Sequence, residues 1–277
     1  MQEFRYLKPE TLEEALNYLE QYGKSARILA GGTDIIIALK DKMITCDYLV
    51  DIKGIKELNE ITYSEKEGLC IGSAVCLNDI IESELVKNNY GILVDAGKTL
   101  ANKLLRNRAT LAGNICNSSP GGDMLPAALV LEGSVHIASK QMNRVIPLKE
   151  FFIGVKKNAL KENEIVTKIS FPANKGNGTY LKKSRIKGHD LAQIGVAGYL
   201  TDSGKLSFAI GAAGPTPVLV NNFSCYKKSE LSDNKAEILS KIVASVSPIT
   251  DVRATKDYRL VMLSYLADKI IEGLGDN

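Results

Sequence analysis

A pair of glycines at the end of a short apolar segment is the first feature of this sequence that could do chemistry. Residues 27–30 read as a strand, and Gly31, Gly32, Thr33 and Asp34 follow it directly. Glycines have no Cβ atom, so the backbone can turn sharply and bring N–H groups within hydrogen-bonding distance of phosphate oxygens. Thr33 and Asp34 can accept hydrogen bonds from the first N–H groups of a following helix, whose dipole favours an anion. The spacing indicates a phosphate-binding turn, and a plain strand-to-helix turn remains the alternative.

This turn differs from the two most familiar nucleotide-binding loops. It matches neither G-x-G-x-x-G nor GxxxxGK[ST], and we expect no acidic residue in Rossmann register at the end of the next strand. The sequence therefore disfavours both a Rossmann dinucleotide site and a P-loop.

A second segment, residues 106–123, is rich in small and polar residues. A long loop without regular structure is predicted at 113–123, and such loops inside compact domains are usually functional. Asp123, at its end, is suited to bind ribose or ribityl hydroxyl groups. The residues that leave room for a ligand or offer it hydrogen bonds are Ala109, Thr110, Ala112, Gly113, Asn114, Ser118 and Ser119. One extended dinucleotide explains two such loops better than coincidence does, and a capped surface loop is the alternative.

Cysteine and histidine spacing argues against a metal centre. The five cysteines form no CxxC pair, whereas zinc ribbons and iron–sulfur clusters need closely spaced thiolates. The two histidines, His136 and His189, lie in neither an HxxxH nor an HExxH frame. We expect no metal ligands and reduced cysteines, so any redox chemistry would need an organic cofactor.

Regular elements must position these two loops. The Thr11/Glu14 capping box predicts a helix that Gly23 ends, followed by strands at 27–30 and 48–51. Further helices are predicted at 79–86, 90–105, 235–246 and around 258–266, and further strands at 69–75, 135–139, 164–171, 179–186, 191–200 and 206–212. Residues 172–178, PANKGNG, have the composition of a linker between two domains.

Length, composition and charge restrict the class of protein. The chain has 277 residues, 45% of them hydrophobic and 24% charged, with a net charge of +3, which is typical of a globular protein of two domains. We expect neither nucleic acid nor membrane as a partner, no signal peptide, and a cytoplasmic location. Residues 140–187 hold twelve basic and three acidic residues, a local net charge of +9. That segment is either a solvated face of the protein, or a surface on which a partner docks or that faces a phosphate group.

Five stretches of this sequence resemble one known family over nearly the whole chain. They are ARILAGGTD at 26–34, RNRATLAGNICNSSPGGD at 106–123, EIVTKISFP at 164–172, the stretch 182–192 ending in HDLA, and DVRATKDYRLVML at 251–263. In these stretches the chain resembles the FAD-binding subunit of the molybdenum hydroxylases of xanthine dehydrogenase type.

The resemblance implies an α+β fold. A vanillyl-alcohol-oxidase or PCMH-type FAD-binding domain is expected at 1–172, with subdomains at about 1–52 and 53–172. A smaller α+β domain, with a sheet and helices of the molybdopterin dehydrogenase flavoprotein type, is expected at 179–277.

The same resemblance assigns roles to individual residues. The first loop would wrap the FAD pyrophosphate with Ile28, Leu29, Ala30, Gly31, Gly32, Thr33, Asp34 and Ile35. A second phosphate and flavin-edge loop would consist of Ala109, Thr110, Leu111, Ala112, Gly113 and Asn114, with Ser118 beside it. Asp123 would hold the polyol or ribose, Val166 would touch the flavin, and Lys182 would face it and stabilise its reduced form.

The implied function is electron transfer within a larger complex. FAD would be bound noncovalently, because no His stands where covalent-flavin relatives have one. The molybdenum cofactor and the [2Fe–2S] clusters would lie on partner chains, an iron–sulfur subunit and a molybdopterin subunit. NAD⁺ would be the acceptor, and this chain would contribute no catalytic residue of its own. The most favoured enzyme complex for this subunit is xanthine dehydrogenase, which oxidises purines.

Three departures and three alternatives accompany this interpretation. The family usually has Gly-Gly where this chain has Ala112-Gly113, Gly-x-Gln at 102–104, and Arg where this chain has Ile186. The AGGTD form differs from the AGGHS of carbon monoxide dehydrogenases. The alternatives are a nicotinate, other heterocycle or aldehyde hydroxylase, a self-sufficient FAD oxidoreductase of UDP-N-acetylmuramate dehydrogenase type, and a flavin-less structural subunit.

Overall fold

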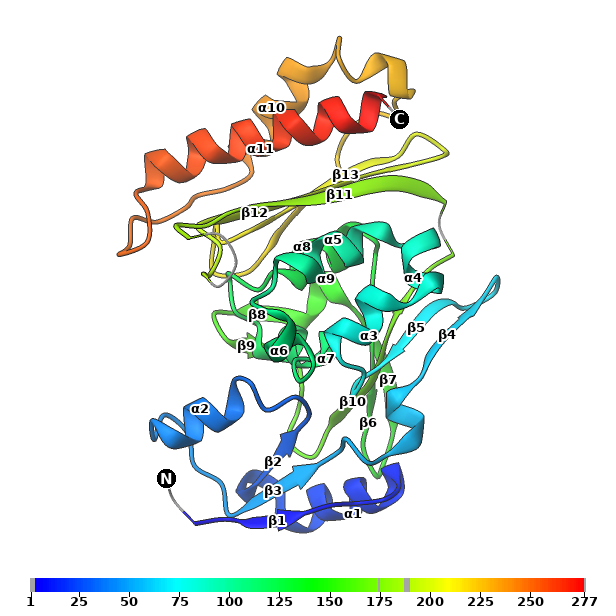
Figure 1. Cartoon of the computed structure of the whole chain (residues 1–277), viewed down its shortest axis with the longest axis vertical. Helices are drawn as coiled ribbons and strands as arrows, with labels where there is room; N and C mark the ends of the chain where they lie inside the picture. The colour runs from blue at the N-terminus through cyan, green and yellow to red at the C-terminus, as the bar shows by residue number, and fades with distance from the viewer. Residues whose placement is uncertain (1–2, 174, 187–189, 277) are drawn as a thin grey trace.

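The computed structural model describes residues 3–173, 175–186 and 190–276, which form three larger sheets and one two-stranded hairpin, with helices between and outside them (Figure 1). His189 lies outside the described residues, as do Lys187 and the middle of the stretch at 182–192. No helix in the described part of the chain is long and apolar enough to cross a membrane.

The first sheet is parallel and carries the glycine turn. Its strand order is β1-β3-β2, with β1 at Arg5–Leu7, β2 at Ala26–Leu29 and β3 at Tyr48–Asp51. Helix α1, Leu12–Tyr22, connects β1 to β2, and α2, Ile35–Lys40, connects β2 to β3. The predicted cap of α1 is confirmed, because the Glu14 N–H donates to Thr11 Oγ1 at 3.2 Å. Both parallel connections bring the ends of β2 and β3 to one edge, where Gly31 follows β2.

The second sheet is antiparallel and forms the centre of the molecule. Its order is β4-β5-β10-β6-β7, with β4 Ile61–Ser64, β5 Gly68–Gly72, β6 Ser134–Ala138, β7 Asn143–Pro147 and β10 Ile165–Phe171. A small hairpin, β8 Phe152–Gly154 and β9 Lys157–Asn158, stands apart from it. The helices of this region are α3 Leu77–Glu82, α4 Glu84–Asn89, α5 Gly91–Thr99, α6 Lys103–Arg106, α7 Leu111–Asn117, α8 Met124–Val130 and α9 Leu148–Phe151.

The third sheet is antiparallel and is buried on both faces. Its strands are β11 Gly176–Lys183, β12 Ile194–Thr201, β13 Leu206–Gly211 and β14 Val218–Val220, in sequence order. Ala197, Tyr199 and Ala209 pack into the core that α3–α8 and the second sheet share. The other face packs against α10, Lys235–Ala244, and α11, Lys256–Asp276, which lie above the sheet in Figure 1. Apolar residues on both faces explain why β12 is almost continuously hydrophobic.

Several sequence-based expectations are wrong at element boundaries. The helix predicted at 90–105 is two helices, because Ala101 has a φ of 44° and the Asn102 side chain caps a new helix by accepting from Leu105 N–H at 2.8 Å. The loop predicted at 113–123 is helical as far as Asn117, since Thr110 caps α7. Strand β11 begins at Gly176, inside the predicted linker. A Cβ on Gly176 would lie 2.5 Å from the Leu200 carbonyl oxygen, so glycine here serves close strand packing.

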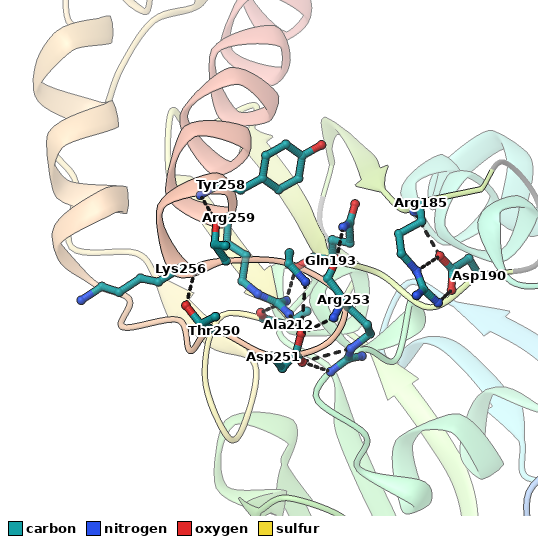
Figure 2. A network of polar contacts seen from close by, with 12 residues as sticks. Arg185, Asp190, Gln193, Ala212, Thr250, Asp251, Arg253, Lys256, Tyr258 and Arg259 are labelled. Carbon is teal, nitrogen blue, oxygen red and sulfur yellow. Dashed lines mark hydrogen bonds and ion pairs between the residues drawn. The ribbon is translucent and has the colours of Figure 1, made fainter.

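A polar network fixes the segment before α11 to the third sheet (Figure 2). Arg259, only 2% exposed, donates to the carbonyl oxygens of Gln193 and Ala212 and, over 2.7 Å, to Asp251 Oδ1. Asp251 also accepts from the guanidinium of Arg253 at 2.8 Å. Burial raises the pKa of Asp251, but hydrogen bonds, mainly from Arg253, outweigh it and hold that pKa well below its usual range.

The network also lies against the end of the second glycine-containing segment. The Ala212 N–H donates to the Pro120 carbonyl oxygen at 2.7 Å, and a Cβ on Gly121 would lie 3.7 Å from the Arg253 guanidinium. The segment before α11 therefore helps to place residues 120–121.

We expect Asp251→Ala to lower the free energy of unfolding by about 2–4 kcal/mol at pH 7, because the buried Arg259 charge loses its carboxylate partner. The folded-state pKa of Asp251 is lowered, so its contribution is present at neutral pH and is lost as the pH falls below about 4. Urea unfolding at pH 7, 5 and 3.5 should show the wild-type advantage shrinking in acid. The neighbouring Val252→Ala, at a side chain 96% exposed, is the control. A cost below about 1 kcal/mol at pH 7 would contradict the role assigned to Asp251.

Candidate functional site

The two glycine-containing segments are in direct backbone contact. A Cβ on Gly31 would lie 2.1 Å from the Arg108 carbonyl oxygen, which is closer than a side chain tolerates, and 3.0 Å from the Ala109 Cα. Gly32 has a φ of 82°, a left-handed conformation that favours glycine. The first glycine is therefore required by close packing and the second by the turn itself.

Local hydrogen bonds shape the second segment. Thr110 Oγ1 accepts from the Gly113 N–H at 2.9 Å and caps α7, and a Cβ on Gly113 would lie 2.8 Å from that same oxygen. Thr110 also forms an isolated antiparallel bridge with Cys76, which ties the start of α7 to the segment before α3. Ala112 is 3% exposed and belongs to the central core. Its methyl group contributes to packing there.

One side-chain contact links the two segments a second time. The Asn117 amide Nδ2 donates to Asp34 Oδ1 at 2.8 Å. The structure therefore brings together the residues predicted for the two loops, from Gly31 and Asp34 on one side to Ala109 and Thr110 on the other.

A cavity of about 460 Å³ opens beside the glycine turn. Sequence reasoning had selected four of its nine lining residues, Leu29, Gly31, Gly32 and Thr33. The others are Tyr6, Ile36, Asp51, Lys53 and Arg108.

Sequence reasoning missed the polar residues of this cavity for identifiable reasons. Asp51 is the last residue of β3, where the strand predicted at 48–51 already placed it, but no role was assigned to it. Arg108 lies in the stretch RNRATLAGNICNSSPGGD at 106–123, but the resemblance assigned it no role. Tyr6 lies on β1, a three-residue strand with no recognisable pattern.

The carboxylate of Asp51 is fully engaged inside the protein. Its Oδ1 accepts from Lys53 Nζ at 2.6 Å and from the Lys53 N–H at 3.0 Å, and its Oδ2 accepts from the Tyr6 hydroxyl. Burial raises the pKa of Asp51, but the hydrogen bonds from Lys53 and Tyr6 outweigh it and lower that pKa overall. Asp51 is thus a carboxylate whose charge Lys53 balances.

A second polar cluster connects the central helices to the third sheet. Lys182 Nζ, on β11, donates to Asp123 Oδ2 at 2.8 Å and to the Thr99 carbonyl oxygen at 3.2 Å, and the Tyr180 hydroxyl donates to Asp123 Oδ1 at 3.0 Å. The side chains of Lys182 and Asp123 are 7% and 6% exposed. Burial raises the pKa of Asp123, with Lys182 and Tyr180 acting in the opposite direction. Asp123 and Lys182, both predicted to contact FAD, are therefore partners of each other.

The other predicted site residues form hydrogen bonds with nearby backbone groups or pack in the protein core. Ser118 has a φ of 48° and its hydroxyl donates to the Ile115 carbonyl oxygen at 2.9 Å. Asn114 Oδ1 accepts from the Met124 N–H at 3.3 Å. Leu111 and Val166 are buried in the central core, whereas Ile28, Ala30 and Ile35 are partly buried around the first sheet. These residues shape the two loops through their backbone and packing.

The basic segment at 140–187 is partly neutralised inside the fold. Arg144 donates to both carboxylate oxygens of Glu164, at 2.8 and 2.6 Å, and Lys182 pairs with Asp123. Within the described residues, no group of three or more His, Cys, Asp and Glu side chains could hold a metal ion.

Comparison with known proteins gives consistent matches. Residues 2–174 match the family described as the FAD binding domain in molybdopterin dehydrogenase. The chain is 30% identical over 275 residues to the xanthine dehydrogenase FAD-binding subunit of Escherichia coli O157:H7, covering 96% of this chain and 94% of that protein. It is 28% identical over 275 residues to the carbon monoxide dehydrogenase medium chain of Hydrogenophaga pseudoflava, covering 97% and 96%.

A solved structure has the same fold. The chain superposes with a TM-score of 0.89 and 26% identity on a chain of carbon monoxide dehydrogenase from Hydrogenophaga pseudoflava, in a form lacking the Mo-pyranopterin moiety of the molybdenum cofactor. The match covers 99% of this chain and 97% of that chain. The α+β fold class predicted from the sequence is confirmed.

We expect Gly31→Ala to destabilise the protein by about 2–4 kcal/mol, because the added methyl group would push the two loops apart. Gly273→Ala is the matched control, since a Cβ on Gly273 meets nothing within 4 Å and alanine favours the helix in which it lies. Thermal unfolding followed by circular dichroism should show a lower midpoint for the first variant and an equal or higher one for the second. Equal midpoints for both would mean that the loops do not pack as described.

The pair of Lys182 and Asp123 gives a second prediction. Lys182→Met should cost about 3–5 kcal/mol of unfolding free energy because it leaves the buried Asp123 carboxylate without its cation. Lys182→Met combined with Asp123→Asn should cost less than Lys182→Met alone, since no uncompensated charge remains. Urea unfolding of both single variants and the double variant measures this coupling. Simple additivity of the two single costs would show that the side chains do not interact.

Proposed function

This chain belongs to the family of FAD-binding domains in molybdopterin dehydrogenases, and from that premise we propose that it carries FAD as the electron-transfer subunit of a multi-subunit molybdenum hydroxylase. The contact that best supports this proposal is the one between Gly31 and the backbone of Arg108 and Ala109. It joins the two segments that a single extended dinucleotide would need to reach together.

The residues present fit such a cofactor. The glycine turn after β2 lines a cavity of about 460 Å³, and the absence of a side chain at Gly31 lets the Arg108 backbone pack directly beside it. Small residues at Ala109 and Gly113 keep the second segment open to close backbone approach. We propose that residues 28–35 and 109–114 hold the FAD, with Ser118, Asp123, Val166 and Lys182 as further contacts.

FAD, when bound, supplies the exchange of electrons between iron–sulfur clusters of a partner subunit and a soluble acceptor, which we propose is NAD⁺. The residues of this chain position and enclose the cofactor. The glycine turn would donate backbone N–H groups, Asn117 links the two loops through Asp34, and Thr110 caps α7. Lys182, fixed by Asp123 and the Thr99 carbonyl oxygen, holds β11 against the central helices.

We propose that the complex also contains an iron–sulfur subunit and a molybdopterin subunit, and that it is of xanthine dehydrogenase type, oxidising purines in the cytoplasm. The relative from Escherichia coli O157:H7, named as a xanthine dehydrogenase subunit, is similar over 96% of this chain. Its name supports this setting. The division into an FAD domain at 1–172 and a second domain from 179 is likewise our proposal, and β11 already begins at Gly176.

The flavin content of the full chain tests the proposal. The purified protein should carry about one FAD per chain, released intact by acid, and NADH should reduce it without a partner subunit. A chain that neither carries nor binds FAD would overturn the function, and an FAD that NADH fails to reduce would overturn the choice of acceptor.

Affinity purification from the native host tests the proposed partner subunits and the substrate of the complex. The chain should bring with it one subunit with [2Fe–2S] clusters and one with molybdopterin, and the complex should oxidise xanthine. Activity on nicotinate or carbon monoxide and none on xanthine would reassign the substrate and leave the flavin role intact.

A further inference from the structure

The turn between β2 and α2 presents three consecutive backbone donors to the cavity. Within residues 3–173, 175–186 and 190–276, the N–H groups of Gly31, Gly32 and Thr33 have no hydrogen-bond acceptor. All three residues line the cavity and are partly exposed to it. Successive free N–H groups in a glycine turn form a concave site that favours an anion.

The charged side chains of this cavity differ in whether they form ion pairs. Lys53 and Asp51 neutralise each other over 2.6 Å, and Tyr6 occupies the second oxygen of Asp51. Arg108 lines the same cavity, and its guanidinium has no hydrogen bond or ion pair with any described residue. With one negative and two positive groups, the cavity carries one uncompensated positive charge, and that charge is on Arg108.

The backbone of Arg108 is hydrogen-bonded and packed, although its side chain has no partner among the described residues. Its N–H donates to the Leu105 carbonyl oxygen at 2.9 Å, and its own carbonyl oxygen is pressed against Gly31. The next residue, Ala109, accepts from the Leu77 N–H at 2.8 Å. This fixed backbone places the Arg108 side chain on the lining of the same cavity as the three N–H groups.

We propose that Arg108 is the residue that binds the diphosphate of FAD and makes the site selective for the dinucleotide over shorter flavins. This inference rests on the proposed function. The guanidinium is planar, always charged, and offers parallel N–H donors that match two phosphate oxygens. Together with the turn it gives the diphosphate a cation and up to three backbone donors. Riboflavin has no phosphate, so it gains nothing from this residue.

Flavin titrations of the full chain test the proposal. The protein is stripped of flavin, and binding of FAD, FMN and riboflavin is followed by fluorescence at two salt concentrations. Arg108→Ala should raise the Kd for FAD by about tenfold or more and weaken its dependence on salt, while the Kd for riboflavin stays unchanged. Arg108→Lys should recover part of the lost affinity for FAD, because lysine keeps the positive charge but lacks the two parallel N–H donors of the guanidinium. ADP should compete with FAD for the wild type and compete less well for Arg108→Ala.

Lys103→Ala is the matched control. Lys103 lies five positions before Arg108, carries the same charge, is 72% exposed and contacts only the exposed Glu82 through its side chain. This variant should bind FAD like the wild type. Because the Arg108 side chain has no partner among the described residues, Arg108→Ala should also unfold at the wild-type temperature.

The outcomes separate the inference from the function on which it rests. If the wild type fails to bind FAD, the proposed function falls and the inference with it. If the wild type binds FAD and Arg108→Ala binds it equally well, only the role of Arg108 is overturned. An equal loss of FAD and riboflavin affinity would also overturn it, since that pattern would mean a distorted site and not a lost phosphate contact.

Discussion

The close contact between Gly31 and the backbone of Arg108 is the constraint on which the rest of the site depends. It presses a turn of the parallel first sheet against the segment that leads into α7, with no room for a side chain between them. Because of this contact, the N–H groups at Gly31–Thr33, the guanidinium of Arg108 and the side chains at the end of β3 face one cavity. Neither the small parallel sheet nor the central helices could form that cavity alone.

The third sheet is as much a part of the central core as of its own domain. Tyr180, Ala197 and Tyr199 pack among the central helices, and the ion pair of Lys182 with Asp123 crosses the same boundary. A buried pair of this kind adds little net stability compared with apolar contacts, but it strongly disfavours any arrangement in which one partner is left alone. Its effect is to fix how β11 lies against the start of α8.

Local chemistry in the sequence predicted the loops, and long-range packing determined the site. The Thr11 cap, the strands predicted at 27–30 and 48–51, and the glycine turn could be predicted because their signals lie within a few residues. The division of the helix predicted at 90–105 was missed because its apolar spacing continues across Ala101, whose positive φ no pattern announced. Tyr6, Asp51 and Arg108 come from three distant segments, so only the packed structure brings them to one cavity. The pairing of Asp123 with Lys182 was missed for the same reason.

The distribution of charge along the site follows the chemistry of the cofactor that we propose for it. Lys182, expected to offer a free positive charge to a flavin, is balanced by Asp123, so that end of the site is close to neutral. At the glycine turn the balance differs, because Asp51 neutralises Lys53, whereas no carboxylate in the described part of the chain pairs with Arg108. An isoalloxazine ring is uncharged when oxidised, whereas a diphosphate carries two negative charges. Because Lys182 is balanced by Asp123 and no described residue pairs with Arg108, the diphosphate and not the uncharged ring is the part of the dinucleotide favoured at Gly31.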